Sequence, residues 1–177
     1  MKKLFIIAAL ALVIGSLSIP AKAAEDVLIV NLQYVVSQSK SGVALRKQSE
    51  DLNKEVVALR DEISKDLQAK GKKLEEDKTL LAPEVFQERL VALQSEAESK
   101  QLELQTRVQK IQEAIQRASS SIDSVMSPIL TEIVNEKGAK ILLDRQAMLF
   151  GDPKLDISAE VVKKLNKRLP DVKVTIK

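Results

Sequence analysis

Two long runs of apolar residues at coiled-coil spacing constrain this chain more than any other feature. In the first run, apolar residues are three, four or seven positions apart: Leu45, Leu52, Val56, Leu59, Ile63, Leu67, Leu74 and Leu81. The second run steps by four and three almost throughout: Phe86, Leu90, Leu93, Ala97, Gln101, Leu104, Val108, Ile111, Ile115, Ala118, Ile122, Val125 and Ile129. Such a narrow stripe is typical of a coiled-coil seam, whereas a helix in a globular bundle usually shows a wider apolar face. The pattern predicts two long helices that need partners.

The stretch TLLAPEVF, residues 79–86, separates the two runs and marks the reversal of the chain. Pro83 disfavours helix at the residue before it but suits the first turn of a new helix. We therefore expect an antiparallel hairpin over residues 41–137 with its tip near 79–86. The tip would carry Leu80, Leu81, Val85 and Phe86. These side chains either pack on one another or contact a bound partner, and partial packing allows both roles.

Short segments at both ends of the chain predict a small β body, formed by residues 24–40 and 138–177. Residues 27–32 (VLIVNL) read as a buried strand, and a short helical turn follows up to residue 40. Three further strands are expected at 139–144, 146–150 and 172–177. The candidate core of the body, or of the oligomer that it forms, is Val27, Leu28, Ile29, Val30, Leu32, Ile141, Leu142 and Leu143. An amphipathic helix over 157–169, with Ser158 as its N-cap, would complete this body. The predicted fold class is α+β, mostly α.

So few strands make a marginal sheet in one chain, which favours assembly of several chains around one apolar interior. The alternative is a monomer whose sheet packs on the 157–169 helix.

The first 23 residues are interpreted as a cleaved signal peptide. A positive start, MKK, precedes an apolar run over residues 4–19, and Ala21-Lys22-Ala23 matches a small-x-small cleavage pattern between Ala23 and Ala24. A membrane anchor is the alternative, but the run is shorter than the ~20 residues that a spanning helix needs. Removal of this segment takes three of the 28 basic residues away and leaves 25 against 25 acidic ones. A nucleic-acid partner is therefore not expected.

The composition gives little support to catalysis. The chain has no histidine and no cysteine, so the commonest general base and the usual zinc ligands are missing. Acidic residues are abundant, but they flank the heptad stripes, where they serve as solvated or inter-helix partners. We expect no enzyme, no metal and no cofactor.

Four segments, in this order behind a signal peptide, resemble the Skp/OmpH family of periplasmic chaperones: IVNLQYVVSQSKSG, LLAPEVFQERL, EKGAKILLDRQAMLFGDPKLDIS and EVVKKLNKRLP. The resemblance spans essentially the whole chain after the signal. It implies a homotrimer in which terminal strands from three chains form a β-barrel body and three helical hairpins surround a cavity. Unfolded outer-membrane proteins would be held there without ATP, on their way across the periplasm.

Two functions remain open from the residues themselves. One is a holdase chaperone, and the other is a coiled-coil spacer or scaffold of the cell envelope. The C-terminal part, residues 138–177, has a net charge of +4, which would suit an anionic membrane surface, although solvated lysines explain it equally well.

Overall fold

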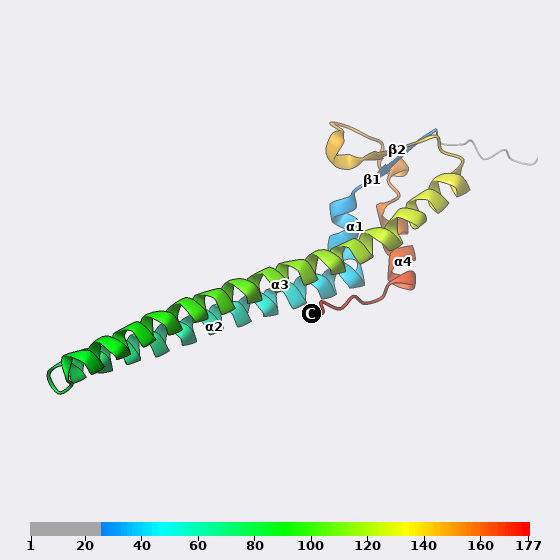
Figure 1. Cartoon of the computed structure of the whole chain (residues 1–177). Helices are drawn as coiled ribbons and strands as arrows, with labels where there is room; N and C mark the ends of the chain where they lie inside the picture. Colours follow the sequence, from blue (N-terminus) through cyan, green and yellow to red (C-terminus); the bar gives the residue numbers. More distant parts are fainter. Residues whose placement is uncertain (1–25) are drawn as a thin grey trace, which may run out of the picture.

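The computed structural model describes residues 26–177 and shows a long helical arm that stands out of a small body (Figure 1). Its helices and strands, in chain order, are β1 (Val27–Val30), α1 (Leu32–Gln38), α2 (Lys40–Glu76), α3 (Pro83–Lys137), β2 (Ile141–Asp144) and α4 (Ser158–Arg168). This architecture confirms the predicted fold class of a mostly helical α+β chain. The predicted signal peptide and its cleavage site at Ala23 and Ala24 lie outside the described residues. Within residues 26–177, no helix has the length and apolar character that crossing a membrane requires.

The body contains a two-stranded sheet whose strands come from opposite ends of the described chain. β1 and β2 run parallel, with Val27 opposite Ile141 and Val30 opposite Asp144. On its other edge, β1 forms a bridge from Ile29 to Asp156, next to which the Ile157 amide donates to the Ile29 carbonyl at 2.9 Å. Parallel strands need a long connection. Here that connection is the whole arm, so the ends of the chain meet as the sequence predicts.

A sharp corner between α1 and α2 sets the direction in which the arm leaves the body. Ser39 is extended and fully buried, and its hydroxyl oxygen accepts from the Gly42 amide at 3.0 Å, which caps α2. Gly42 lies against the backbone of α1: a Cβ there would be 1.8 Å from the Val36 carbonyl oxygen. Only glycine permits this approach.

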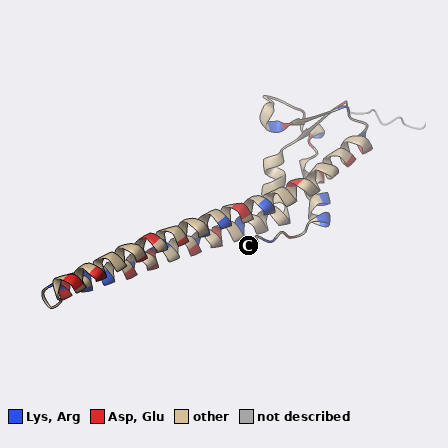
Figure 2. Cartoon of the chain, viewed as in Figure 1, with Lys and Arg blue, Asp and Glu red and all other residues tan. Residues whose placement is uncertain are grey.

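The arm is an antiparallel pair, with α2 lying along the N-terminal part of α3 (Figure 1). Each helix can bury only the stripe that faces its partner, and between Gly42 and Leu104 the one buried side chain is Leu74. Acidic and basic residues follow the arm (Figure 2). Two ion pairs join α2 to α3, Lys70–Glu96 and Arg107–Glu55, and a third, Arg89–Asp77, joins α3 to the turn after α2. Exposed pairs of this kind each contribute little. The apolar seam therefore holds the arm together.

The main apolar core lies at the root of the arm, where α3 meets α1, α4 and the sheet. Its buried members are aliphatic: Leu28, Val30, Val35, Ala118, Ile122, Met126, Ile129, Ile133, Ile157, Val161, Leu165 and Val172. α4 contributes Val161 and Leu165, both with no exposed surface, from its apolar face. The predicted N-cap of this helix is wrong. Ser158 is the first residue inside α4, and the Asp156 carboxylate accepts from its amide at 2.9 Å instead.

Two predicted strands are absent from the described residues. At 146–150, the chain forms a 3-10 turn, η2 (Arg145–Ala147), because the Asp144 carboxylate accepts from the Gln146 amide at 2.9 Å and turns the backbone. Residues 172–177 are extended but lie against helices instead of pairing in a sheet. β1 offers neither segment an edge, because β2 pairs with one side of it and Asp156 bridges the other. The outer edge of β2 stays unpaired within the described residues.

Candidate functional surfaces

The first candidate surface is the arm tip, which is closed by a short 3-10 turn and a proline-started helix. After α2, η1 (Asp77–Thr79) tightens the chain, and the amides of Leu80 and Leu81 both donate to the Asp77 carbonyl, at 2.9 and 3.1 Å. Ala82 then takes the extended conformation that a residue before proline prefers, and its carbonyl accepts from the Phe86 amide at 3.0 Å. The tip is thus fixed by backbone bonds that do not need its apolar side chains.

The four predicted tip residues divide into two pairs. Leu80 is 81% exposed and Val85 is 39% exposed, whereas Leu81 and Phe86 are half-buried. The ammonium of Lys78 lies 5.8 Å from the centre of the Phe86 ring, within cation–π range. The packing at the tip is therefore partial, which leaves both predicted roles available. Contact with a partner protein stays a prediction.

Beside the tip, the two arm helices enclose an open groove of about 310 Å³ with an apolar floor that includes Leu74 and Leu93. Lys70 spans its rim by donating to Asp66 on its own helix and to Glu96 on α3. These two hydrogen bonds raise the pKa of Lys70. Two ion pairs, Lys70–Glu96 and Arg89–Asp77, line this groove together with Lys73.

The second candidate surface is the outer face of the sheet. Leu28 and Val30 face the core, and their neighbour Leu142 is partly buried against it. Side chains alternate across a strand, so Ile29, Ile141 and Leu143 lie on the opposite face. Ile29 is covered by the loop at 148–151, but Ile141 is 49% and Leu143 38% exposed.

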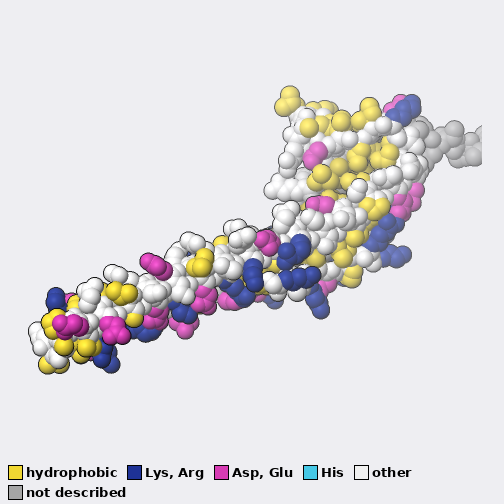
Figure 3. Space-filling view, viewed as in Figure 1, with side chains coloured by type: hydrophobic (Ala, Val, Ile, Leu, Met, Phe, Trp, Pro, Cys, Tyr) yellow, Lys and Arg dark blue, Asp and Glu magenta, His cyan; other side chains and the backbone are white. Residues whose placement is uncertain are grey.

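The 148–151 loop adds two large apolar side chains to this exposed face. Leu149 is fully exposed and Phe150 is 88% exposed. The space-filling view shows hydrophobic side chains gathered on the body and again at the arm tip (Figure 3). We call Ile141, Leu143, Leu149 and Phe150 the outer apolar patch. A sheet with two apolar faces needs a layer on each, and this chain supplies the inner one.

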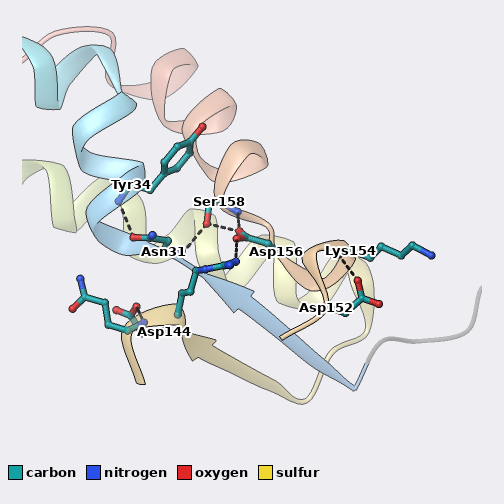
Figure 4. A network of polar contacts seen from close by, with 9 residues as sticks. Asn31, Tyr34, Asp144, Asp152, Lys154, Asp156 and Ser158 are labelled. Carbon is teal, nitrogen blue, oxygen red and sulfur yellow. Dashed lines mark hydrogen bonds and ion pairs between the residues drawn. The ribbon is translucent and has the colours of Figure 1, made fainter. Parts of the chain in front are cut away.

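A polar network holds the loops that support this patch (Figure 4). The Ser158 hydroxyl accepts from the Asn31 amide at 2.7 Å and donates to Asp156, whose other carboxylate oxygen accepts from Arg145 at 3.1 Å. Burial alone would raise the pKa of Asp156, but the hydrogen bonds from Ser158 and Arg145 outweigh burial and lower it. The network ties α1, α4 and the turn after β2 together. Every buried polar side-chain atom in the described part of the chain has a hydrogen-bond partner.

A cluster of ion pairs fastens α4 to the end of α3. Lys164 bridges Glu132 and Glu136, Arg168 also pairs with Glu132, and Lys137 pairs with Glu160. Hydrogen bonds from Lys164 and Arg168 lower the pKa of Glu132. Two basic residues of the C-terminal part, Lys164 and Arg168, are thus already paired. An anionic membrane surface as partner stays a prediction. Among residues 26–177, no group of three or more acidic residues could hold a metal ion.

A family model described as outer membrane protein (OmpH-like) matches residues 26–165. The chain belongs to the OmpH-like family. The structure is also similar to the crystal structure of a Caulobacter crescentus CB15 protein described as an OmpH-like outer membrane chaperone. The TM-score is 0.80 at 23% identity, and the match covers 86% of this chain and 90% of that one. At this identity the likeness establishes the fold. A comparison with curated proteins finds no match.

Membership of the OmpH-like family confirms that the chain is not an enzyme and confirms the resemblance seen in the sequence. The eight residues predicted for the oligomer or body core differ in burial within one chain. Leu28, Ile29 and Val30 are buried, Val27, Leu32 and Leu142 are partly buried, and Ile141 and Leu143 are exposed.

Sequence reasoning did not select Leu149 and Phe150 as site residues, although the apolar run at 148–150 was a usable signal. It also missed Gln48, whose bonds to residues 172 and 174 have no local sequence signature.

Proposed function

We propose that the chain is an ATP-independent holdase chaperone that keeps unfolded outer-membrane proteins soluble in the periplasm. The observation that carries this proposal is the arm with exposed apolar residues at its far end, where Leu80 is 81% exposed. A spacer has no use for such residues, because exposed leucines lower solubility. Family membership and the description of the similar Caulobacter protein support the same role.

The mechanism we propose is confinement. Unfolded chains would make many weak apolar and charge contacts with the arms, so that two clients cannot pair their strand edges with each other. Such contacts need no nucleotide, and the sequence contains no Gly-rich phosphate loop. Release would follow from the weakness of each contact.

The cavity would require several arms, and the outer apolar patch supports assembly with other copies of the chain. The number of three chains follows the family resemblance. Burying Ile141, Leu143, Leu149 and Phe150 against other copies would cover the second face of the sheet and pair the outer edge of β2. Replacing Phe150 with aspartate should lower the mass measured by light scattering from three protomers to one. Leu80→Asp is the matched control, since Leu80 has a similar exposed fraction, 81% against 88% for Phe150, but lies at the tip. It should leave the mass unchanged. A wild-type mass of one protomer at micromolar concentration excludes the assembly.

The holding activity can be tested by diluting a urea-unfolded β-barrel membrane protein into buffer without ATP. The wild-type protein should suppress light scattering. Leu81→Ser with Phe86→Ser, and separately Leu80→Ser with Val85→Ser, should both weaken this suppression more than they change the oligomer mass. Leu102→Ser is the control, because Leu102 is 64% exposed but lies away from the tip. If the tip variants lose holding and assembly in equal measure, the tip is structural.

One outcome would distinguish the chaperone from an envelope scaffold, and a second would test the predicted export to the periplasm. An intact oligomer that never suppresses aggregation would indicate a spacer. Export through a cleaved signal peptide predicts that the protein recovered from the periplasmic fraction begins at Ala24 on N-terminal sequencing.

A further inference from the structure

The last residues of the chain form a strap, residues 171–177, that crosses the root of the arm. The strap is extended, and its side chains alternate strictly in burial. Val172 is buried in the core and Val174 packs against it, while Asp171, Lys173 and Thr175 are exposed. The family model ends at residue 165, so the strap lies outside the region that matches the family.

The hydrogen bonds that hold the strap all use its backbone atoms. The Gln48 carboxamide on α2 donates to the Val172 carbonyl at 2.7 Å and accepts from the Val174 amide at 2.9 Å. These are the two bonds that a neighbouring strand would make, supplied here by one side chain. Arg117 on α3 donates to the Thr175 carbonyl at 3.3 Å. Within residues 26–177, no strap side chain makes a hydrogen bond or an ion pair.

A surface that binds a peptide in this way does not depend on the peptide's exposed side chains. Gln48 contacts only a backbone carbonyl and a backbone amide, which every extended peptide has. The core requires only apolar side chains at alternate positions. Recognition through main-chain bonds with pockets for alternate side chains is a known mode of binding extended peptides. The surface under the strap is therefore built to hold a strand-like segment.

The strap sequence VKVTIK has the alternation of a membrane β-strand, in which apolar residues face lipid and polar residues face the interior. We propose that the surface under the strap is a binding site for strand-like segments of unfolded outer-membrane proteins, and that the strap is an internal occupant that clients displace. This inference rests on the proposed function and adds a site at the arm root to the contacts at the tip.

Displacement is feasible because the strap makes few polar contacts: release breaks its two hydrogen bonds with Gln48 and the one from Arg117. Being tethered, the strap competes at a high effective concentration, of the order of millimolar for a short link. Short peptides should therefore bind weakly to the intact protein. A long client with many alternating segments competes better, since each segment can rebind.

A peptide experiment tests the site directly on the full-length chain. Val172→Ser with Val174→Ser and Ile176→Ser keeps the strap but removes its apolar side chains, which frees the surface. A fluorescent DVKVTIK peptide should bind this variant at least about tenfold more tightly than it binds the wild type, by anisotropy. The peptide VVIKKTD, of the same composition without alternation, should not bind. Adding Gln48→Glu should abolish binding, since a carboxylate cannot donate to the peptide carbonyl, whereas adding Gln94→Glu, on an exposed side chain of the arm, should not.

A second experiment follows the strap in the otherwise wild-type chain. Because the sequence has no cysteine, Lys177→Cys gives a single site for a spin label or a fluorophore. An unfolded β-barrel membrane protein at saturating concentration should raise the mobility of the label, and a folded soluble protein should not. This reading does not require the serine variant to fold.

The outcomes separate this proposal from the proposed function. If the wild type suppresses aggregation but the label does not move and the freed surface binds no peptide, the strap is a fixed part of the body and the inference is overturned. If DVKVTIK binds the freed surface with the predicted dependence on Gln48 but no client is held, the site stands and the chaperone function fails.

Discussion

The arm and the body of this protein are stabilised in different ways. The body closes a core in which Leu28, Ile129 and Ile133 have essentially no exposed surface, whereas most of the arm buries single stripes of a two-helix seam. A pair of helices has no third element to cover its flanks, so the arm remains mostly surface. The apolar side chains of the body are buried in a packed core, whereas most side chains of the arm remain exposed and can contact another protein.

Because of this difference, substitutions should change the stability of the fold more in the body than in the arm. In the body, a substitution meets neighbours on every side, because interiors are packed as densely as organic crystals. In the arm, the same substitution meets solvent or one facing helix.

Truncation of a core residue at the root should have the largest effect. Ile133→Ala removes a fully buried side chain from α3 and should cost about 2–5 kcal/mol in the free energy of unfolding, measured by urea denaturation with circular dichroism. The matched arm variant, Leu102→Ala on the same helix, should change it by less than about 0.5 kcal/mol. Similar costs at both positions would show that the arm is packed as tightly as the root.

Two glycines allow the same substitution to be made in both regions with opposite results. At the corner, Gly42→Ala places a Cβ against the Val36 carbonyl oxygen and should destabilise the fold by about 1–3 kcal/mol. In the arm, a Cβ at Gly71 meets only the Leu93 Cδ2 at 3.9 Å, so Gly71→Ala should stabilise α2 by about 1 kcal/mol. Thermal unfolding by circular dichroism compares the two, and a stabilised Gly42→Ala variant would contradict the close corner.

The smallest expected effect is on the pH dependence of stability, and it arises from Asp156 in the body. The pKa of Asp156 is lowered in the folded chain, because the hydrogen bonds from Ser158 and Arg145 outweigh the opposing effect of burial. The stabilisation is therefore present above the unfolded pKa, near 3.9, and is lost as the pH falls through the lower folded value. Asp156→Asn should flatten part of the fall in the urea midpoint below about pH 4. Glu132, whose pKa is also lowered, should account for a further part, and an unchanged pH profile in Asp156→Asn would contradict this assignment.

The arm could be predicted from the sequence in more detail than the body. Its heptad pattern is local, and Pro83 marks the start of the returning helix because the ring itself restricts the backbone. The parallel partner of β1 could also be expected, since a hairpin brings both ends together. Ser158 was misplaced because the sequence does not say whether Ser158 or the preceding Asp156 accepts the first free amide.

Alternating segments were the weakest point of the prediction. Alternation in VKVTIK correctly indicates an extended chain with one apolar side, but it does not reveal what covers that side, and here helices and Gln48 do so. The same ambiguity applies to the outer apolar patch. The sequence identified Ile141 and Leu143 as apolar partners, yet only the register with β1 shows that they face away from the core.

The long separation between β1 and β2 also affects the order in which the molecule can form. Val27 pairs with Ile141, which is separated from it in sequence by the whole arm, whereas only a short turn connects α2 and α3. Pairing of segments that are distant in sequence is slower, so the sheet should form after the arm. During synthesis from the N-terminus, Leu28, Ile29 and Val30 are therefore exposed as an unpaired apolar strand until β2 has been synthesised. During that interval the protein faces the same danger of wrong strand pairing as the proteins that we propose it guards.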